Sequence, residues 1–235
     1  MMDEEQERLS MKQQFIWLND MLDSLPVQTM IYDGIEADDT IAYLTKHTQY
    51  DLDGEVVIVS TDKYFLQLVS DNVKVFSPTK KKMYNRQVVF DEFGIWPENL
   101  LLYRTLDGDK SDNIPGIRGC GIKTLLKRFP ELSEDRTITH EEFFKMCEEK
   151  QGKIKMYDDI LKAKDQLLMN KRLMELHEPH IPTNQKLQIL DRFNENDIEF
   201  KKLDFLRVGQ KYKVLQNWRD INDWLHSTFH NIITK

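Results

Sequence analysis

The sequence lacks the features of a membrane or secreted protein. Its 235 residues contain no stretch near the ~18 consecutive apolar residues of a membrane span. The acidic start, Met1–Glu7, has no apolar signal-peptide core. Two cysteines, Cys120 and Cys147, give no disulfide framework. We therefore expect one large or two small globular domains in a reducing cytoplasm, with no membrane partner.

An excess of positive charge is also lacking. The chain has 33 basic and 40 acidic residues, which gives a net charge of −7. Taken over the whole chain, this balance argues against a nucleic-acid partner. The charge is uneven, however: residues 72–90 hold five basic residues and no acid, and residues 110–128 hold five basic residues and one acid. Local patches decide phosphate binding more than net charge does, so a nucleic-acid partner stays open.

Hydrophobic periodicity predicts alternating helices and strands over the first part of the chain. The apolar spacing indicates a helix at 13–25, a second helix from residue 36 and a third at 64–69. Short apolar runs at 27–32, 55–59 and 73–76 read as strands. The run at 55–59 is continuously apolar, as in a sheet covered on both faces. This order predicts an α/β fold with a partial parallel sheet and flanking helices.

After residue 90 the pattern becomes helical. The expected helices span residues 98–106, 122–129, 140–150, 154–176 and 217–233. A boundary near Asp107 divides the chain into an α/β core, residues 1–106, and a helical region, residues 107–235. The candidate metal site described next would lie on this boundary.

Acidic residues cluster directly after the expected helix 98–106. Asp109 and Asp112 lie three residues apart, so on a helical turn they would share a face. Two carboxylates held that close repel each other unless a cation lies between them. The alternative is an ordinary Asp-rich loop with a helix cap, because Asp, Gly and Asn are common loop residues.

Two further acidic groups lie where a strand passes into a helix. Glu36, Asp38 and Asp39 begin one helix, and Asp62 follows the run at 55–59. Helix capping would explain one or two of these acids, and it is the alternative for Asp62 as well. Carboxylate clusters that offer only oxygen select hard ions such as Mg²⁺ or Mn²⁺.

The motifs together resemble the 5′-nuclease family, which includes flap endonucleases, phage 5′→3′ exonucleases with RNase H activity, and the 5′-nuclease domain of bacterial DNA polymerase I. The resemblance rests on Glu-Ala-Asp-Asp at 36–39, Ser-Thr-Asp-Lys at 60–63, and GDKSDNIPGIRGCGIKT from Gly108. It implies catalytic roles for four aspartates and two divalent metal sites. The implied catalytic residues are Asp39, Asp62, Asp109 and Asp112, and the implied metal ligands are these four with Glu36 and Asp38.

The glycine turn after the aspartates resembles the helix–turn–helix-like element with which the family grips duplex DNA and a potassium ion. The resemblance places K⁺ at the Gly119–Gly121 turn. Backbone amides at glycines can approach phosphate closely. The implied DNA-binding residues are Gly116, Arg118, Gly119, Gly121, Lys123, Thr124 and Lys127. The alternative is an ordinary Gly-rich connection between helices.

The chain departs from the family pattern at two places. Tyr64 stands where members usually carry a second carboxylate in Asp-x-Asp, and a neutral phenol is a poor replacement for a carboxylate ligand. Members also begin with a metal-binding strand and a basic helical arch, neither of which precedes the helix at 13–25. We therefore expect a member without its N-terminal part, for which a separate polypeptide would be a partner.

The resemblance implies a Mg²⁺-dependent, structure-specific 5′ nuclease of replication and repair, working in the cytoplasm of a bacterium or a phage-infected host. Its substrates would be branched or 5′-ended duplex DNA, RNA primers or RNA–DNA hybrids. Tyr64 favours the alternative of a non-catalytic flap-DNA-binding remnant or one subunit of a split nuclease. A third alternative, a carboxylate-metal phosphatase without nucleic acid, is disfavoured by the basic glycine turn.

Overall fold

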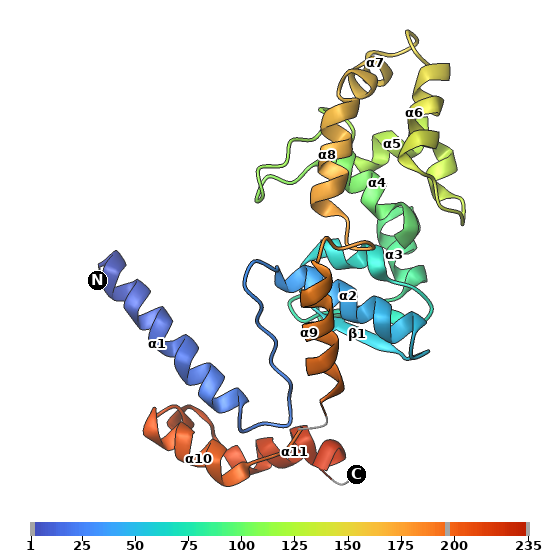
Figure 1. The fold of residues 1–235 in the computed structure, drawn as a ribbon. Coiled ribbons are helices and arrows are strands. Elements are labelled where there is room, and N and C mark those ends of the chain that lie inside the picture. Colours follow the sequence, from blue (N-terminus) through green and yellow to red (C-terminus); the bar gives the residue numbers. More distant parts are fainter. Residues whose placement is uncertain (1–2, 196–197, 234–235) are drawn as a thin grey trace. The chain divides into compact units, whose positions relative to one another are not determined.

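The computed structural model describes residues 3–195 and 198–233. It forms two compact units, one of Met1–Asp33 with Thr183–Lys235 and the other of Gly34–Pro182 (Figure 1). These units differ from the functional division predicted at Asp107, which stays a prediction. No helix within the described residues is both long and apolar enough to cross a membrane.

The unit Gly34–Pro182 begins with a small sheet and its helices. The elements are α2 (Ala37–Tyr50), β1 (Val56–Val59), η1 (Lys63–Leu68), β2 (Val73–Ser77) and β3 (Lys82–Tyr84). β1 and β2 are parallel, with Val56 opposite Val73. β2 and β3 form an antiparallel hairpin. The predicted α/β fold with a parallel strand pair is thereby confirmed.

The prediction that both faces of the strand at 55–59 are buried is wrong. Ile58 of β1 is buried in the core that also contains Ala42 of α2. Val57 and Val59 point to the opposite face and are 53% and 66% exposed. The apolar run therefore does not indicate a strand enclosed on both sides.

The hairpin of β2 and β3 carries lysines that are tied to one carboxylate. Lys80 and Lys82 donate to the two carboxylate oxygens of Glu92 at 2.9 and 2.8 Å. Burial alone would raise the pKa of Glu92, but hydrogen bonds from Lys82, Lys80 and Tyr84 lower it to about 2. Glu92 thus offsets one of the five positive charges in this part of the sequence.

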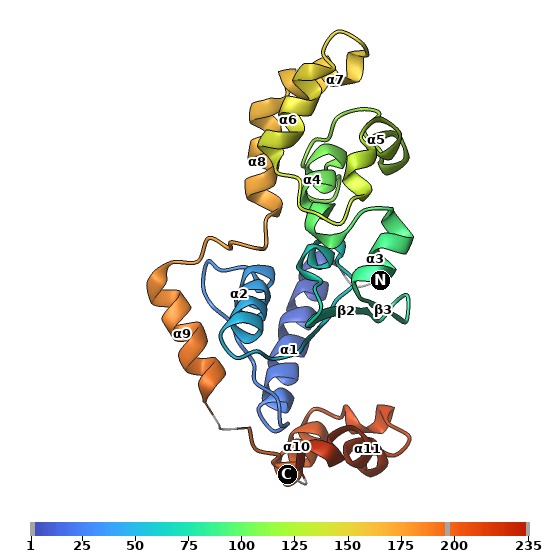
Figure 2. The same ribbon diagram turned by 90° about the vertical axis from the view of Figure 1, so that its right-hand side faces the viewer.

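The rest of this unit is helical. Its elements are α3 (Arg86–Phe93), α4 (Pro97–Asp107), α5 (Ile122–Arg128), η2 (Pro130–Ser133), α6 (His140–Glu149), α7 (Lys155–Lys162) and α8 (Lys164–Met174). α4 packs against both η1 and α8, and Figure 2 shows α4 beside α8. Leu106 of α4 lies in one continuous core with Phe65 of η1 and Leu167 of α8. This shared core is why the compact unit extends across residue 107.

One predicted helix is divided in the structure. The expected helix at 154–176 is two helices that meet at Ala163, whose backbone N–H donates to both the Asp159 and Ile160 carbonyls at 3.1 Å. Such a shared bond tightens the last turn of a helix. α7 packs on α6 and α8 packs on α4, so the two helices pack mainly against different parts of the unit.

The second unit is built from helices at both ends of the chain. Its elements are α1 (Glu4–Leu22), α9 (Thr183–Asn194), α10 (Lys202–Lys211), η3 (Leu215–Asn217) and α11 (Ile221–Ile233). Met21 of α1 is buried with Phe205, Leu225 and Phe229. The predicted C-terminal helix is confirmed but begins at Ile221, because the Asp220 side chain accepts the first free N–H groups of α11.

Two predictions for the N-terminal segment need correction. α1 begins well before residue 13, because Asp3 and Gln6 form a reciprocal capping box. Residues 27–32 do not form a strand. A strand needs a partner for its backbone, and this segment belongs to a unit without strands among its described residues. The Gln28 side chain instead donates to the Arg192 and Glu195 carbonyls.

Candidate functional site: an acid-lined cleft at the end of α4

The acidic loop after α4 is a closed turn and not the helical turn predicted from the spacing of its acids. Asp109 and Ile114 exchange backbone hydrogen bonds of 2.8 and 2.7 Å and so close the loop. Asn113 within it adopts φ +56°. The loop returns to the helix where the Ile117 N–H donates to the Leu106 carbonyl at 2.7 Å.

Two glycines let the loop return this closely. A Cβ on Gly116 would overlap the Asp107 carbonyl, and a Cβ on Gly108 would overlap the backbone of Gly116. Gly108 also has φ +75°, a region that favours glycine. Gly116, predicted to contact DNA, therefore has a structural reason to be glycine.

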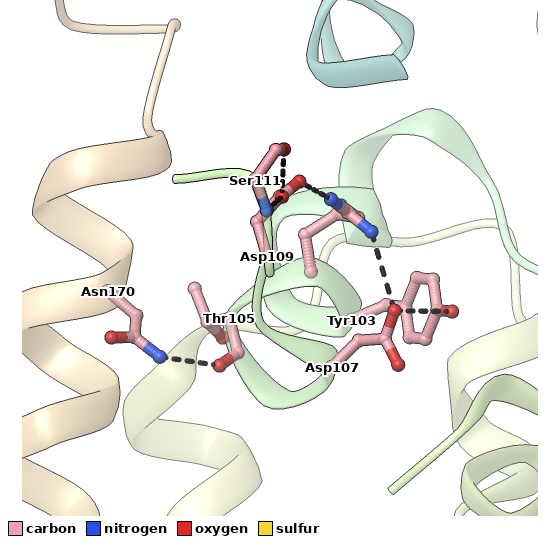
Figure 3. A network of polar contacts seen from close by, with 7 residues as sticks. Tyr103, Thr105, Asp107, Asp109, Ser111 and Asn170 are labelled. Carbon is pink, nitrogen blue, oxygen red and sulfur yellow. Dashed lines mark hydrogen bonds and ion pairs between the residues drawn. The ribbon is translucent and has the colours of Figure 1, made fainter. Parts of the chain in front are cut away.

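A buried side chain from α8 fastens the loop to the end of α4. Asn170 is 2% exposed and donates to the Thr105 carbonyl at 3.0 Å, as Figure 3 shows, and to the Pro115 carbonyl at 2.8 Å. Gln166 also donates to Pro115, at 2.8 Å. The last carbonyls of a helix have no partner within it, so Asn170 satisfies one of them while it positions the loop.

The end of this helix and the acidic loop line a cleft of about 570 Å³ together with residues that follow β1. Three of the predicted acids, Asp62, Asp109 and Asp112, line it, and Tyr64 lines it as well. Asp62 also accepts a 2.8 Å hydrogen bond from the Tyr64 N–H as the N-cap of η1. The structure thus brings residues that lie far apart in the sequence to one cleft.

Asp109 is enclosed by protein donors. Its Oδ1 accepts from the Ser111 N–H at 2.8 Å and from the Ser111 hydroxyl, and its Oδ2 accepts from Arg104 at 2.6 Å. The bonds from Ser111 contribute most to lowering the pKa of Asp109 to about 2; burial opposes them, and Tyr64 and Arg104 lower it further. Figure 3 shows Ser111 folded over Asp109, with Asp107 bonded to the Tyr103 hydroxyl.

The acids at the start of α2 meet other acids. Glu36 makes no side-chain cap to α2, so the capping alternative does not explain it. Burial raises the pKa of Asp38, and the charges of Asp62, Glu36, Asp39 and Asp112 raise it further. The negative charges of Asp62 and Asp112 thus both act on the carboxyl group of Asp38. The negative charge of these acids is what a bound cation would offset.

The remaining acid of this group, Asp39, is half-buried. Burial and the charge of Glu36 raise its pKa, and His180 lowers it. The imidazole of His180 is thus an additional group near the predicted site. Within residues 3–195 and 198–233, no three His, Cys, Asp or Glu side chains stand ready to hold one ion together.

Sequence reasoning missed Arg104, Ser111 and Tyr103. Arg104 donates to Asp107 at 3.4 Å as well as to Asp109, and its guanidinium carbon lies 5.1 Å from the centre of the Tyr64 ring. The three-residue spacing of Arg104 and Asp107 on a helix was a usable signal for the first pair. The sequence holds no comparable signal for the contact with Tyr64.

The predicted DNA-gripping turn leads from the acidic loop into α5. Gly119 has φ +89°, whereas Gly121, at the start of α5, has open space around it. Arg118, Lys123, Thr124 and Lys127 are exposed. No ion pair involves Lys123 or Lys127 within the described part of the chain, so both ammonium groups are available to bind an anion.

Part of the chain is similar to a known protein family. Residues 4–94 match the family model of the 5′-3′ exonuclease N-terminal resolvase-like domain. This part of the chain is therefore similar to that domain. The family resemblance inferred from the sequence motifs is confirmed.

Curated proteins are similar to a longer part of the chain. A 5′-3′ exonuclease of Aquifex aeolicus is 33% identical over 188 residues, which cover 78% of this chain and 56% of the relative. DNA polymerase I of Bacillus subtilis is 32% identical over 170 residues, 69% of this chain and 18% of the polymerase. The chain thus spans about half the length of the exonuclease relative and a smaller share of the polymerase.

Solved structures show the same fold. The bacteriophage T5 D15 protein, co-crystallised with metal ions, matches with a TM-score of 0.61 at 22% identity over 88% of this chain and 73% of its own. A variant T5 D15 flap endonuclease in complex with DNA and metal ions matches with a TM-score of 0.54 at 22% identity over 77% of this chain and 62% of its own. These matches confirm the α/β fold with its helical extension.

Proposed function

We propose that this chain is part of a metal-dependent, structure-specific 5′ nuclease, which hydrolyses phosphodiesters at the 5′ ends or flaps of DNA or of RNA primers during replication and repair. The observation that carries the proposal is the convergence of Asp62, Asp109 and Asp112 on one cleft, with Asp38 close enough to feel two of them. The names of the relatives, 5′-3′ exonuclease and DNA polymerase I, support the same activity.

The donor chemistry suits a hard divalent cation, because the acids offer carboxylate oxygens, although no three of them in the described residues are already grouped around one point. Carboxylate oxygens are the ligands that Mg²⁺ and Mn²⁺ prefer, and the mutual repulsion of acids around Asp38 favours a cation there. Asp38, Asp62 and Asp112 are the residues that would hold it, with Glu36 and Asp39 in support. When bound, such an ion activates water and stabilises the leaving oxygen of a phosphodiester. The chain's own acids would fix its place.

The turn from Gly116 to α5 would hold the DNA backbone next to this cleft. Arg118, Lys123 and Lys127 are exposed and basic, and phosphate contacts of this kind position a duplex without reading its sequence. The K⁺ at Gly119–Gly121 and the RNA–DNA hybrid as a substrate are parts of this proposal that rest on the family resemblance.

The test is single-turnover cleavage of an end-labelled 5′-flap duplex by the pure chain with Mg²⁺, with EDTA as the blank. We expect Asp112→Asn to reduce the rate by orders of magnitude, because it removes one of the acids around the cation. Asp191→Asn is the matched control, since Asp191 is an exposed acid on α9 outside the cleft.

The main alternative is a non-catalytic flap-binding protein, and Tyr64 in the cleft favours it. Salt-sensitive flap binding without Mg²⁺-dependent cleavage would support that alternative and contradict the enzymatic proposal. Equal rates for Asp112→Asn and Asp191→Asn would contradict the assignment of the cleft.

A further inference from the structure

The first half of the acidic loop is fastened to α4 by Asp109. Its Oδ2 accepts a hydrogen bond of 2.6 Å from Nη2 of Arg104, which lies in the last turn of α4. Its Oδ1 accepts from the Ser111 N–H at 2.8 Å and from the Ser111 hydroxyl, as Figure 3 shows. The side chains of Arg104 and Asp109 are only 18% and 16% exposed, so water screens their ion pair little. Asp109 thus joins the end of the helix to the turn that follows it.

This arrangement leaves Asp109 little capacity for a metal ion. An ionised carboxylate can accept bonds at about four positions, and three of those of Asp109 already hold protein donors. An ion at the remaining position would lie beside the guanidinium of Arg104, and the two positive charges would repel each other. Arginine stays protonated in proteins, so this repulsion is permanent. The surroundings of Asp109 therefore do not fit a ligand of a divalent cation.

Arg104 is itself fixed from two further directions. Its Nη1 makes a longer contact of 3.4 Å with Asp107, and its guanidinium carbon lies 5.1 Å from the centre of the Tyr64 ring, within the range of a cation–π contact. Tyr64 stands where the family pattern has a second carboxylate. A neutral phenol does not compete with Asp109 for the guanidinium, so Arg104 keeps Asp109 as its 2.6 Å partner.

Asp112 lies in the same loop, but its surroundings differ. Its side chain is exposed, lines the cleft, and makes neither a hydrogen bond nor an ion pair within the described part of the chain. Asp112 lies between two fastenings of the loop, which are Asp109 before it and Pro115, held by Asn170, after it. The backbone pairing of Asp109 with Ile114 closes the loop around it. The loop thus uses one acid inside the protein and presents the other to the cleft.

We propose that Asp109 is a positioning residue and not a metal ligand, and that its bonds to Arg104 and Ser111 hold the loop so that Asp112 faces the cleft. The role of Asp112 in this inference rests on the proposed function. The inference departs from the catalytic role that the family resemblance implies for Asp109, because both oxygens of this carboxylate already have protein donors.

The first measurement needs no metal and uses urea denaturation of the full chain in EDTA, followed by far-ultraviolet circular dichroism. Asp109→Asn should lower the equilibrium constant for folding by about tenfold or more, because it weakens charge-assisted hydrogen bonds in a largely buried place. Asp112→Asn is the matched control, since it makes the same chemical change in the same loop. It should alter that constant by no more than about twofold, because its carboxylate has no partner to lose within the described residues.

The second measurement is the affinity for Mn²⁺, by isothermal titration calorimetry. Asp109→Asn leaves Arg104 without its partner beside the cleft and should weaken binding. Adding Arg104→Gln removes that charge and lets the two amides bond to each other, so this double variant should recover most of the lost affinity. Lys110→Gln combined with Asp109→Asn has the same formal charge and also removes a cation of the cleft, but it leaves Arg104 unpaired and should recover less.

Two results would overturn the proposal. One is equal stability of Asp109→Asn and Asp112→Asn in EDTA. The other is equal Mn²⁺ affinity of the two double variants, because the gain would then come from charge alone.

A milder variant covers the case in which Asp109→Asn does not fold. Ser111→Ala removes only the hydroxyl bond to Asp109 and should speed amide exchange at Ile114, whose N–H donates to the Asp109 carbonyl at 2.7 Å. Unchanged exchange at Ile114 would overturn the proposal. Absence of Mn²⁺ binding by the unmodified chain would contradict the proposed function, whereas the comparison in EDTA would still decide the role of Asp109.

Discussion

Asn170→Ala should loosen the acidic loop far more than its single side chain suggests. The amide supplies the donor for the Thr105 carbonyl and one of two donors for the Pro115 carbonyl. A buried acceptor left without a donor costs about 1–3 kcal/mol, and a lost hydrogen bond whose acceptor keeps another partner costs about 0.5–1.5 kcal/mol. We therefore expect the free energy of unfolding to fall by about 2–4 kcal/mol.

The assay is urea denaturation followed by far-ultraviolet circular dichroism, together with amide hydrogen exchange at Ile117. The Ile117 N–H bonds to the end of α4, so it should exchange faster once the loop is released. Gln166→Ala is the matched control, because Gln166 is exposed, Pro115 keeps its bond from Asn170, and surface changes are usually within about 0.5 kcal/mol. Equal destabilisation by the two variants would refute the reasoning.

Three further predictions concern the loop, the hairpin and the basic turn. Gly116→Ala should lower the melting temperature and the Mn²⁺ affinity, because its Cβ overlaps backbone, whereas Gly121→Ala, which has open space, should change neither; equal effects would contradict this. The pKa of Glu92 lies at about 2, below its ordinary 4.5, so its stabilising effect should be full above pH 4.5 and disappear as the pH falls towards 2. Glu92→Gln should therefore differ from the unmodified chain in stability near pH 6 and much less near pH 2, as chemical denaturation at both values can check. Lys123→Ala and Lys127→Ala should each lower the slope of log K against log salt for duplex binding by about one unit, and a loss confined to one DNA sequence would argue against phosphate contacts.

The sequence predicted secondary structure best where the residues that pair with or cap a segment lie close to it along the chain. The runs at 56–59 and 73–77 became paired strands, because β-branched residues lie in both and the chain between them allows a parallel crossing. The run at 27–32 has similar residues but no neighbouring strand, and a strand without a partner leaves its backbone unpaired. Whether two distant segments pair cannot be predicted from the residues of either segment alone.

The positions of the acids in the candidate site were predictable from the sequence. Positions after β1 and after α4 placed Asp62, Asp109 and Asp112 on one cleft, because ligand-binding groups gather at such junctions. The chemical state of Asp109 was not predictable. It depends on Arg104 and Ser111 approaching from both sides, and the spacing of acids says nothing about which of them already has a cation.

The pairing of the two chain ends in one unit has a consequence for synthesis. The Tyr212 hydroxyl donates to Asp20, the Lys201 N–H donates to the Ser24 carbonyl at 3.0 Å, and Trp17 stacks on Tyr212. At roughly 5–20 residues per second, α1 leaves the ribosome some 10–40 s before these partners exist. Gly34–Pro182 is continuous and holds its own core, so it can fold during that interval. The nascent chain would thus carry a finished cleft while α1, with Met21 still uncovered, is exposed to chaperones and proteases.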